Sequence, residues 1–156
     1  MTSFAGVPSW MLSLLQKVIE KTGRNNVIDI WNDCEVYFHG GVSFEPYKIL
    51  YKELFPSKDF KYFEIYNASE GFFGIQDQVN SKDLLLMLDY GIFYEFIPFD
   101  QIQEEEPKAL DISQVKINQV YALLITTNAG LWRYNIGDTI IFTSINPHRI
   151  LSLIHI

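Results

Sequence analysis

Several features that would identify particular classes of protein are scarce or missing in this 156-residue sequence. Cys34 is the single cysteine, so the chain can form no internal disulfide and no cysteine-based zinc site. The three histidines show no metal-ligand spacing. No apolar run reaches the roughly 18 residues of a membrane span, and no basic region precedes the first apolar residues as in a secretion signal. We therefore expect a protein of the reducing cytoplasm.

Positive charge is also scarce, with 12 Lys and Arg against 19 Asp and Glu, a net charge of −7 and a pI of about 4.8. An acidic surface repels nucleic acids and anionic membranes, so we expect neither as a partner. By contrast, hydrophobic residues make up 48% and aromatic residues 15% of the chain. This composition predicts a globular protein, and the length allows one domain with a substantial core.

Apolar residues at helical spacing predict two helices, at 9–23 and 44–55. Ser9 and Ser43 are the expected N-caps, and Gly23 is the expected C-terminal stop of the first helix. Apolar or alternating stretches predict strands at 34–39, 62–66, 84–90, 92–98, 120–127 and 139–144. We expect a break at 137–138, just before the last of these strands. The order strand, helix, strand predicts a parallel βαβ unit within an α/β fold, with a mixed sheet and packed helices.

One stretch, residues 62–74, combines an alternating strand with a polar end. The strand stops at Ser69-Glu70-Gly71, which would deliver a hydroxyl and a carboxylate to the edge of a sheet. Glycine beside them would let a ligand approach the backbone, and open α/β sheets bind ligands at the carboxyl ends of their strands. The same residue types are also typical of an ordinary surface turn.

A second glycine-containing turn lies upstream, at residues 38–43 (FHGGVS). It is either a loop without bulky side chains that packs along a flat ring, or a plain strand-to-helix turn. We interpret His39 as a strand-end histidine rather than a catalytic base. Residues 104–106 are three glutamates before a proline, which indicates a solvated loop and not a metal site.

Three motifs in order and rough spacing resemble those of the auxin-responsive acyl-acid-amido synthetase family of the adenylate-forming superfamily. They are the Gly-Gly loop at 38–43, the Tyr-x-x-Ser-Glu motif at 66–70 and the Tyr-Arg-x-Gly-Asp block within 130–138. The likeness covers nearly all of residues 1–150 and is to bacterial members rather than plant ones. It implies that residues 1–150 are part of the large N-terminal domain of an adenylate-forming enzyme.

The same resemblance predicts that the chain is an internal fragment. The family's phosphate loop and its small C-terminal domain have no counterpart here, so we expect the polypeptide alone to be inactive. Residues 151–156 (LSLIHI) can be back-translated to the transposon end used in sequencing libraries. We therefore expect this tail to be translated adapter rather than native sequence.

The activity that the resemblance implies is adenylation of a carboxylic acid by ATP, followed by transfer of the acyl group to an amine such as an amino acid. In that reaction Glu70 would hold Mg²⁺ and Ser69 would donate to the α-phosphate. Tyr66 would flank the adenine, and Asp138 would accept both ribose hydroxyls. Phe93 would line the nucleotide or acyl site, unless it is a core or surface-strand aromatic. The implied nucleotide-binding residues are Gly40, Gly41, Val42, Ser43, Tyr66, Asn67, Ala68, Ser69, Glu70, Phe93, Arg133 and Asp138.

The sequence departs from the family pattern at Asn135, where many members have an arginine. Arg133 lies two residues earlier, and strand alternation would place it on the same face, where it would supply the charge instead. Two alternatives to the amide synthetase stay open. One is a carboxylate–thiol ligase that transfers the acyl group to coenzyme A, and the other is a non-catalytic nucleotide- or partner-binding module.

Overall fold

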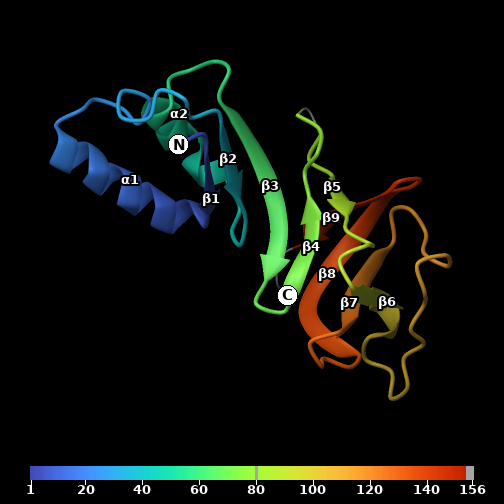
Figure 1. Cartoon of the computed structure of the whole chain (residues 1–156). Helices are drawn as coiled ribbons and strands as arrows, with labels where there is room; N and C mark the ends of the chain where they lie inside the picture. Colours follow the sequence, from blue (N-terminus) through green and yellow to red (C-terminus); the bar gives the residue numbers. More distant parts are fainter. Residues whose placement is uncertain (80, 154–156) are drawn as a thin grey trace. The chain divides into compact units, whose positions relative to one another are not determined.

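The computed structural model describes residues 1–79 and 81–153. The chain divides into two compact units, Met1–Ile65 and Tyr66–Ile156, and strand β3 (Lys61–Ala68) crosses the boundary between them. Figure 1 labels the elements along the chain. The first unit contains helices and parallel strands, and the second consists mainly of antiparallel strands, which confirms the expected α/β class with mixed strand directions.

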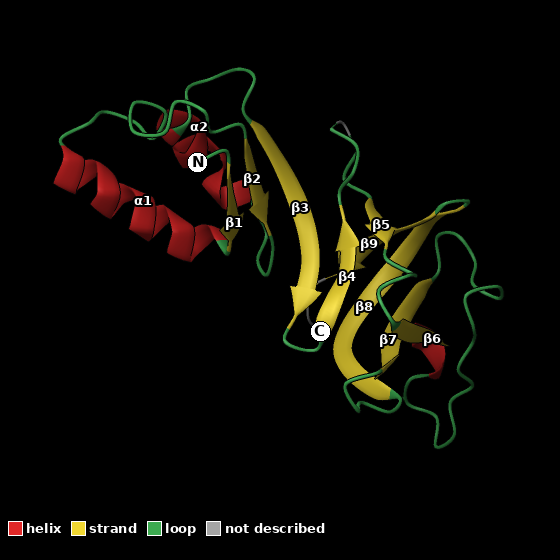
Figure 2. Ribbon diagram, viewed as in Figure 1, coloured by secondary structure: helices red, strands yellow, loops and turns green. Residues whose placement is uncertain are grey.

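The first unit is built from two successive strand–helix–strand connections. Strands β1 (Ser3–Gly6), β2 (Val36–His39) and β3 pair in parallel. Helix α1 (Pro8–Thr22) joins β1 to β2, and the short helices η1 (Glu45–Tyr47) and α2 (Lys48–Leu54) join β2 to β3 (Figure 2). The predicted parallel βαβ unit is confirmed.

The ends of the helices differ partly from the prediction. Gly23 ends α1 as expected, with φ +65° and its N–H donating to the Ile19 carbonyl. The prediction of Ser9 as N-cap is wrong, because Val7 takes that position and Pro8 occupies the first turn, where its missing N–H costs nothing. Ser43 does not cap the second helix either, since Phe44 precedes η1 with no side-chain cap.

Tyrosine hydroxyls fix the start of α1 inside the first unit. The rings of Tyr37 and Tyr51 stack with centroids 4.9 Å apart. The Tyr37 hydroxyl donates to the Gly6 carbonyl and the Tyr51 hydroxyl to the Pro8 carbonyl, both at 2.8 Å. These bonds satisfy buried polar groups. The Tyr51 bond ties the start of α1 to α2, and the Tyr37 bond ties the end of β1 to β2.

The second unit is an antiparallel sheet in the order β4-β5-β9-β8-β7-β6. A short helix, η2 (Phe99–Gln101), follows β6. The strands are β4 (Gly71–Ile75), β5 (Leu84–Leu86), β6 (Ile92–Pro98), β7 (Val120–Thr127), β8 (Tyr134–Ile145) and β9 (His148–Leu153).

The predicted break at residues 137–138 is wrong, because β8 runs through both positions. Gly137 adopts φ +87°, and the register against β7 shifts between Ala122 and Leu124. A bulge absorbs extra residues without ending a strand, and glycine readily takes the positive φ that such a site requires. The glycine therefore marks a bulge and not a boundary.

The strands β6, β7 and β8 separate two faces with different surroundings. Tyr94 and Phe96 of β6 point into the main core, which contains Tyr66, Phe73, Leu84, Leu86, Val115, Tyr121, Leu123, Ile125, Ile140, Phe142 and Ile150. Ile97, on the opposite face, packs in a smaller cluster with Ala122 and Leu124. This alternation decides which of the predicted site residues can meet.

The end of the chain is part of the sheet as far as the structure describes it. Residues 151–153 belong to β9 and pair with β8 from Thr139 to Ile141. Residues 154–156, including His155, lie outside the described residues. The adapter origin of 151–156 stays a prediction. Among the described residues, no helix has the length and apolar character that a membrane crossing requires.

Candidate functional site

The central motif lies where β3 turns into β4. Ser69 and Glu70 form a two-residue turn between these strands, so the hydroxyl and the carboxylate stand at the carboxyl end of β3 as predicted. Asn67 and Ser69 are exposed, whereas Glu70 is half-buried. A Cβ on Gly71 would lie 2.7 Å from Ile92 Cδ1, so the end of the Ile92 side chain would have to shift to admit a larger residue there.

The structure brings together two predicted site residues that are distant in sequence, Tyr66 and Asp138. The Tyr66 hydroxyl donates to Asp138 Oδ2 at 2.8 Å, across 72 residues of sequence. Both side chains are buried, at 8% and 6% exposure. Burial and the neighbouring Asp138 carboxylate raise the pKa of Tyr66, so the phenol stays protonated and remains a donor.

Arg133 lies on the side of the sheet that was predicted, but outside the strand. It precedes β8 and adopts φ +46°, so strand alternation does not set its direction. It nevertheless lies on the same side of the sheet as Asn135, because Asn135 is opposite Leu124, Leu124 is opposite Glu95, and Arg133 pairs with Glu95. Its N–H donates to Thr126 Oγ1 and its Nε to Glu95 Oε2, each at 3.0 Å. Asn135 accepts a hydrogen bond from the Gly137 N–H at 2.9 Å and thereby supports the bulge.

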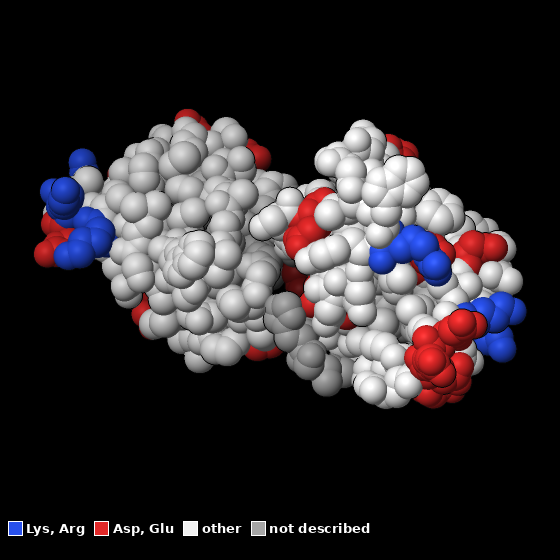
Figure 3. Space-filling view, turned by 90° about the horizontal axis from the view of Figure 1, so that it is seen from below, with Lys and Arg blue, Asp and Glu red and all other residues white. Residues whose placement is uncertain are grey.

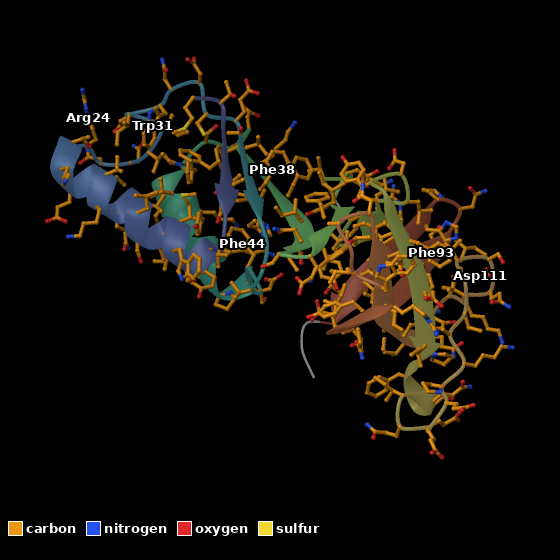
Figure 4. All side chains as sticks on the ribbon, turned by 60° about the horizontal axis from the view of Figure 1, so that its bottom comes forward. Arg24, Trp31, Phe38, Phe44, Phe93 and Asp111 are labelled. Carbon is orange, nitrogen blue, oxygen red and sulfur yellow. The ribbon has the colours of Figure 1, made fainter. Side chains whose placement is uncertain are left out.

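Phe93 lies on the face of β6 opposite to Tyr94 and is 60% exposed. Figure 4 labels it. It lines an open hollow of about 550 Å³ together with Gly91, Ile92, Thr126, Thr127, Asn128, Gly130 and Trp132. Tyr66 belongs to the core on the other face, and the Arg133–Glu95 pair lies on the Phe93 side. The structure therefore joins Tyr66 to Asp138 and separates Phe93 and Arg133 from them.

The Gly-Gly loop belongs to the first compact unit. A Cβ on Gly40 would lie 2.3 Å from the Ile65 carbonyl oxygen, which no side chain can accommodate. Gly41 has φ +81°, a conformation that favours glycine. Backbone packing thus explains both glycines as parts of a turn, while Val42 and Ser43 are exposed and accessible to a ligand.

His39, directly before this loop, is a core residue. It is 5% exposed, stacks on Phe44 with centroids 4.1 Å apart, and its Nδ1 has no hydrogen-bond partner among the described residues. Burial, aided by the positive charge of Lys48, lowers the pKa of His39 to about 4. The imidazole is therefore neutral at neutral pH, in agreement with a strand-end histidine.

This buried imidazole makes a specific pH dependence expected. The folded pKa of about 4 lies below the ordinary 6.5, so the contribution of His39 is fully present above pH 6.5 and is lost as the pH falls toward 4. Between pH 7 and pH 5 we expect the free energy of unfolding to fall by about 2 kcal/mol from this residue. Urea unfolding at both pH values measures it. His39→Phe should lose most of that difference, and an unchanged difference would contradict the assignment.

The charged residues offer no preformed metal centre within residues 1–79 and 81–153. No group of three or more His, Cys, Asp or Glu side chains there could hold a metal ion. The face drawn in Figure 3 shows acidic and basic side chains in small separate groups, without a broad basic patch. Any metal held by Glu70 would therefore take most of its ligands from a bound molecule or water.

Two of the contacts found here had weak signals in the sequence. Asp138 is a carboxylate inside an apolar strand, and a buried carboxylate needs a hydrogen-bond donor. Nothing in the sequence spacing identifies Tyr66 as that donor. Glu95 stands in the alternating strand beside Phe93, where a charged side chain suggests a partner. Its pairing with Arg133 depends on the left-handed backbone at Arg133, which the sequence does not reveal.

Part of the second unit matches a protein-family model. Residues 85–152 match the GH3 family central domain. A putative indole-3-acetic acid-amido synthetase GH3.9 of Arabidopsis thaliana is 34% identical over 90 residues, which cover 49% of this chain and 15% of that protein. The jasmonoyl-L-amino acid synthetase JAR4 of Nicotiana attenuata is 31% identical over 81 residues, covering 48% and 14%.

Solved structures show the same fold. A GH3.15 acyl acid amido synthetase aligns with a TM-score of 0.61 at 19% identity, covering 87% of this chain and 25% of that one. CmiS6 aligns with a TM-score of 0.55 at 14% identity, covering all of this chain and 41% of that one. The chain spans about 15% of the length of the curated relatives described above. Those relatives are plant proteins, so they give no support to the expected bacterial type.

Proposed function

We propose that this chain is part of an ATP-dependent acyl-acid-amido synthetase. The observation that carries the proposal is the match of residues 85–152 to the GH3 family central domain. Relatives named as indole-3-acetic acid-amido and jasmonoyl-amino acid synthetases support a carboxylic acid and an amino acid as the two substrates. Its bacterial type, a cytoplasmic location and the absence of nucleic-acid and membrane partners remain predictions.

Adenylation joins two anions, a carboxylate and the α-phosphate of ATP, and expels pyrophosphate. The site must therefore supply positive charge and hydrogen-bond donors. Mg²⁺ suits a site with one or two carboxylates because phosphate oxygens and water complete its coordination. The single Glu70 carboxylate at the turn after β3 fits this need, and the exposed Ser69 hydroxyl is available to donate to the α-phosphate. Bound Mg²⁺ would neutralise the charge on the phosphates.

In this proposal the nucleoside would contact Asp138 through its ribose. Asp138 would accept the ribose hydroxyls, and since it is 6% exposed, the side chains that cover it must yield when ATP binds. Asn67 and Ala68 are proposed adenine contacts. For the loop 40–43, which belongs to the first unit, an adenine contact stays a prediction. For Phe93 and Arg133 a nucleotide contact stays a prediction. Both lie on the face of β6 and β7 opposite to Tyr66 and Asp138, which counts against it.

The second half-reaction distinguishes the amide synthetase from its alternatives. The full-length protein would be incubated with ATP, Mg²⁺ and a panel of carboxylic acids, with either mixed amino acids or coenzyme A, and the products analysed by mass spectrometry. We expect an acyl amide and AMP. A coenzyme A thioester in place of the amide would contradict the amide assignment. The absence of both products and of ATP binding would favour a non-catalytic module.

A further inference from the structure

The Tyr66 ring is enclosed by protein. It is 8% exposed and packs against Phe73, with centroids 5.0 Å apart and an interplanar angle of 58°. A ring that stacks on adenine has to present a face to the ligand. The enclosed ring presents none in this structure, whereas the hydroxyl already contacts the Asp138 carboxylate.

The hydroxyl of Tyr66 makes a specific hydrogen bond. It donates to Asp138 Oδ2 at 2.8 Å, an ordinary distance for a hydrogen bond from a hydroxyl to an oxygen. A carboxylate can rotate about its last torsion, and a fixed donor on one oxygen decides which way the other oxygen faces. Because a carboxylate can accept about four hydrogen bonds, the bond from Tyr66 does not exhaust it.

This bond also links two parts of the chain that carry the proposed chemistry. Tyr66 lies in β3, three residues before Ser69, and Asp138 lies in β8, directly after the bulge at Gly137. Both belong to the second compact unit. Removing the Tyr66 hydroxyl would therefore first change the orientation of the Asp138 carboxylate.

We infer that Tyr66 is a positioning residue, whose hydroxyl orients the Asp138 carboxylate toward the ribose hydroxyls of ATP. The inference rests on the proposed function. It assigns to Tyr66 a role that acts through another residue and predicts selectivity for the ribose diol. A role in adenine stacking would make no such distinction.

The test compares ATP with 2′,3′-dideoxy-ATP, measured by isothermal titration calorimetry on the full-length protein. The wild-type protein should bind ATP more tightly than the dideoxy compound. In Tyr66→Phe, which keeps the ring and removes the hydroxyl, we expect this preference to fall by about tenfold, while affinity for the dideoxy compound stays the same. In an Asp138→Ala background, Tyr66→Phe should have no further effect on the preference.

Tyr94→Phe is the matched control. Tyr94 lies in the same core cluster, and its hydroxyl donates to the Met87 carbonyl at 3.1 Å, so its removal tests the loss of a buried hydroxyl away from Asp138. It should leave the preference unchanged. An equal loss for both nucleotides in Tyr66→Phe, or no loss, would overturn the inference alone. A wild-type protein that binds no ATP would overturn the proposed function as well.

Discussion

Glu70→Ala is expected to lower the rate of acid-dependent AMP formation by about 100-fold or more in the full-length protein, because it removes the proposed carboxylate ligand of Mg²⁺. The effect should be on catalysis rather than on folding. Glu70 stands in a two-residue turn and is half-buried, and the core packs without it. Its loss should therefore leave the thermal unfolding temperature nearly unchanged.

The dependence on metal concentration makes this prediction specific. If Glu70 binds Mg²⁺, then Glu70→Ala should require a higher Mg²⁺ concentration for half-maximal rate, and Glu70→Asp should recover part of the wild-type behaviour. Asp89→Ala is a suitable control, since Asp89 is an exposed acidic residue in the turn before β6. A Glu70→Ala protein with the same Mg²⁺ dependence as the wild type would show that Glu70 is not the metal ligand.

Phe96→Ala should destabilise the second unit by about 3–5 kcal/mol, the usual cost of removing a buried phenyl ring. Phe96 is fully buried, and its ring makes edge contacts with Tyr121 and Phe142 at centroid distances of 6.2 and 5.1 Å. Removing it would leave a cavity between three strands, where close packing allows little relaxation. Urea unfolding of the purified protein, followed by tyrosine and tryptophan fluorescence, measures the change.

Phe93→Ala is the matched control for this substitution. Phe93 lies three residues earlier on the same strand, on the opposite face, and is 60% exposed. Its replacement should cost less than about 1 kcal/mol, as for most surface positions. Similar costs for Phe93→Ala and Phe96→Ala would contradict the two-faced arrangement of β6.

The secondary structure followed from the sequence where one physical signal dominated. The apolar spacing of the first helix and Gly23 at its end predicted α1, and the strongly apolar 120–127 predicted β7 with its bounds. The N-cap failed because Pro8 competes with Ser9 for the helix start. The break at 137–138 failed because a glycine with positive φ serves a bulge as readily as a turn, and the sequence does not distinguish them.

The sequence predicted which residues belong to the candidate site, but not which of their side chains lie close together. The order Ser69-Glu70 after an alternating strand placed both groups at the end of β3. Which face Phe93 occupies relative to Asp138 depends on the register of β6, β7 and β8, and on a bulge that adds residues between Asn135 and Thr139. Long-range contacts such as Tyr66 with Asp138 come from that register, which no local pattern records.

The most direct test of the central claim is ATP–pyrophosphate exchange by the full-length protein with a panel of carboxylic acids. The account predicts exchange that depends on Mg²⁺ and on one class of acid, and that is lost in Glu70→Ala and Asp138→Ala. A folded protein that shows no exchange with any acid of the panel and binds no ATP in a titration would contradict the claim that this chain is part of an adenylating enzyme.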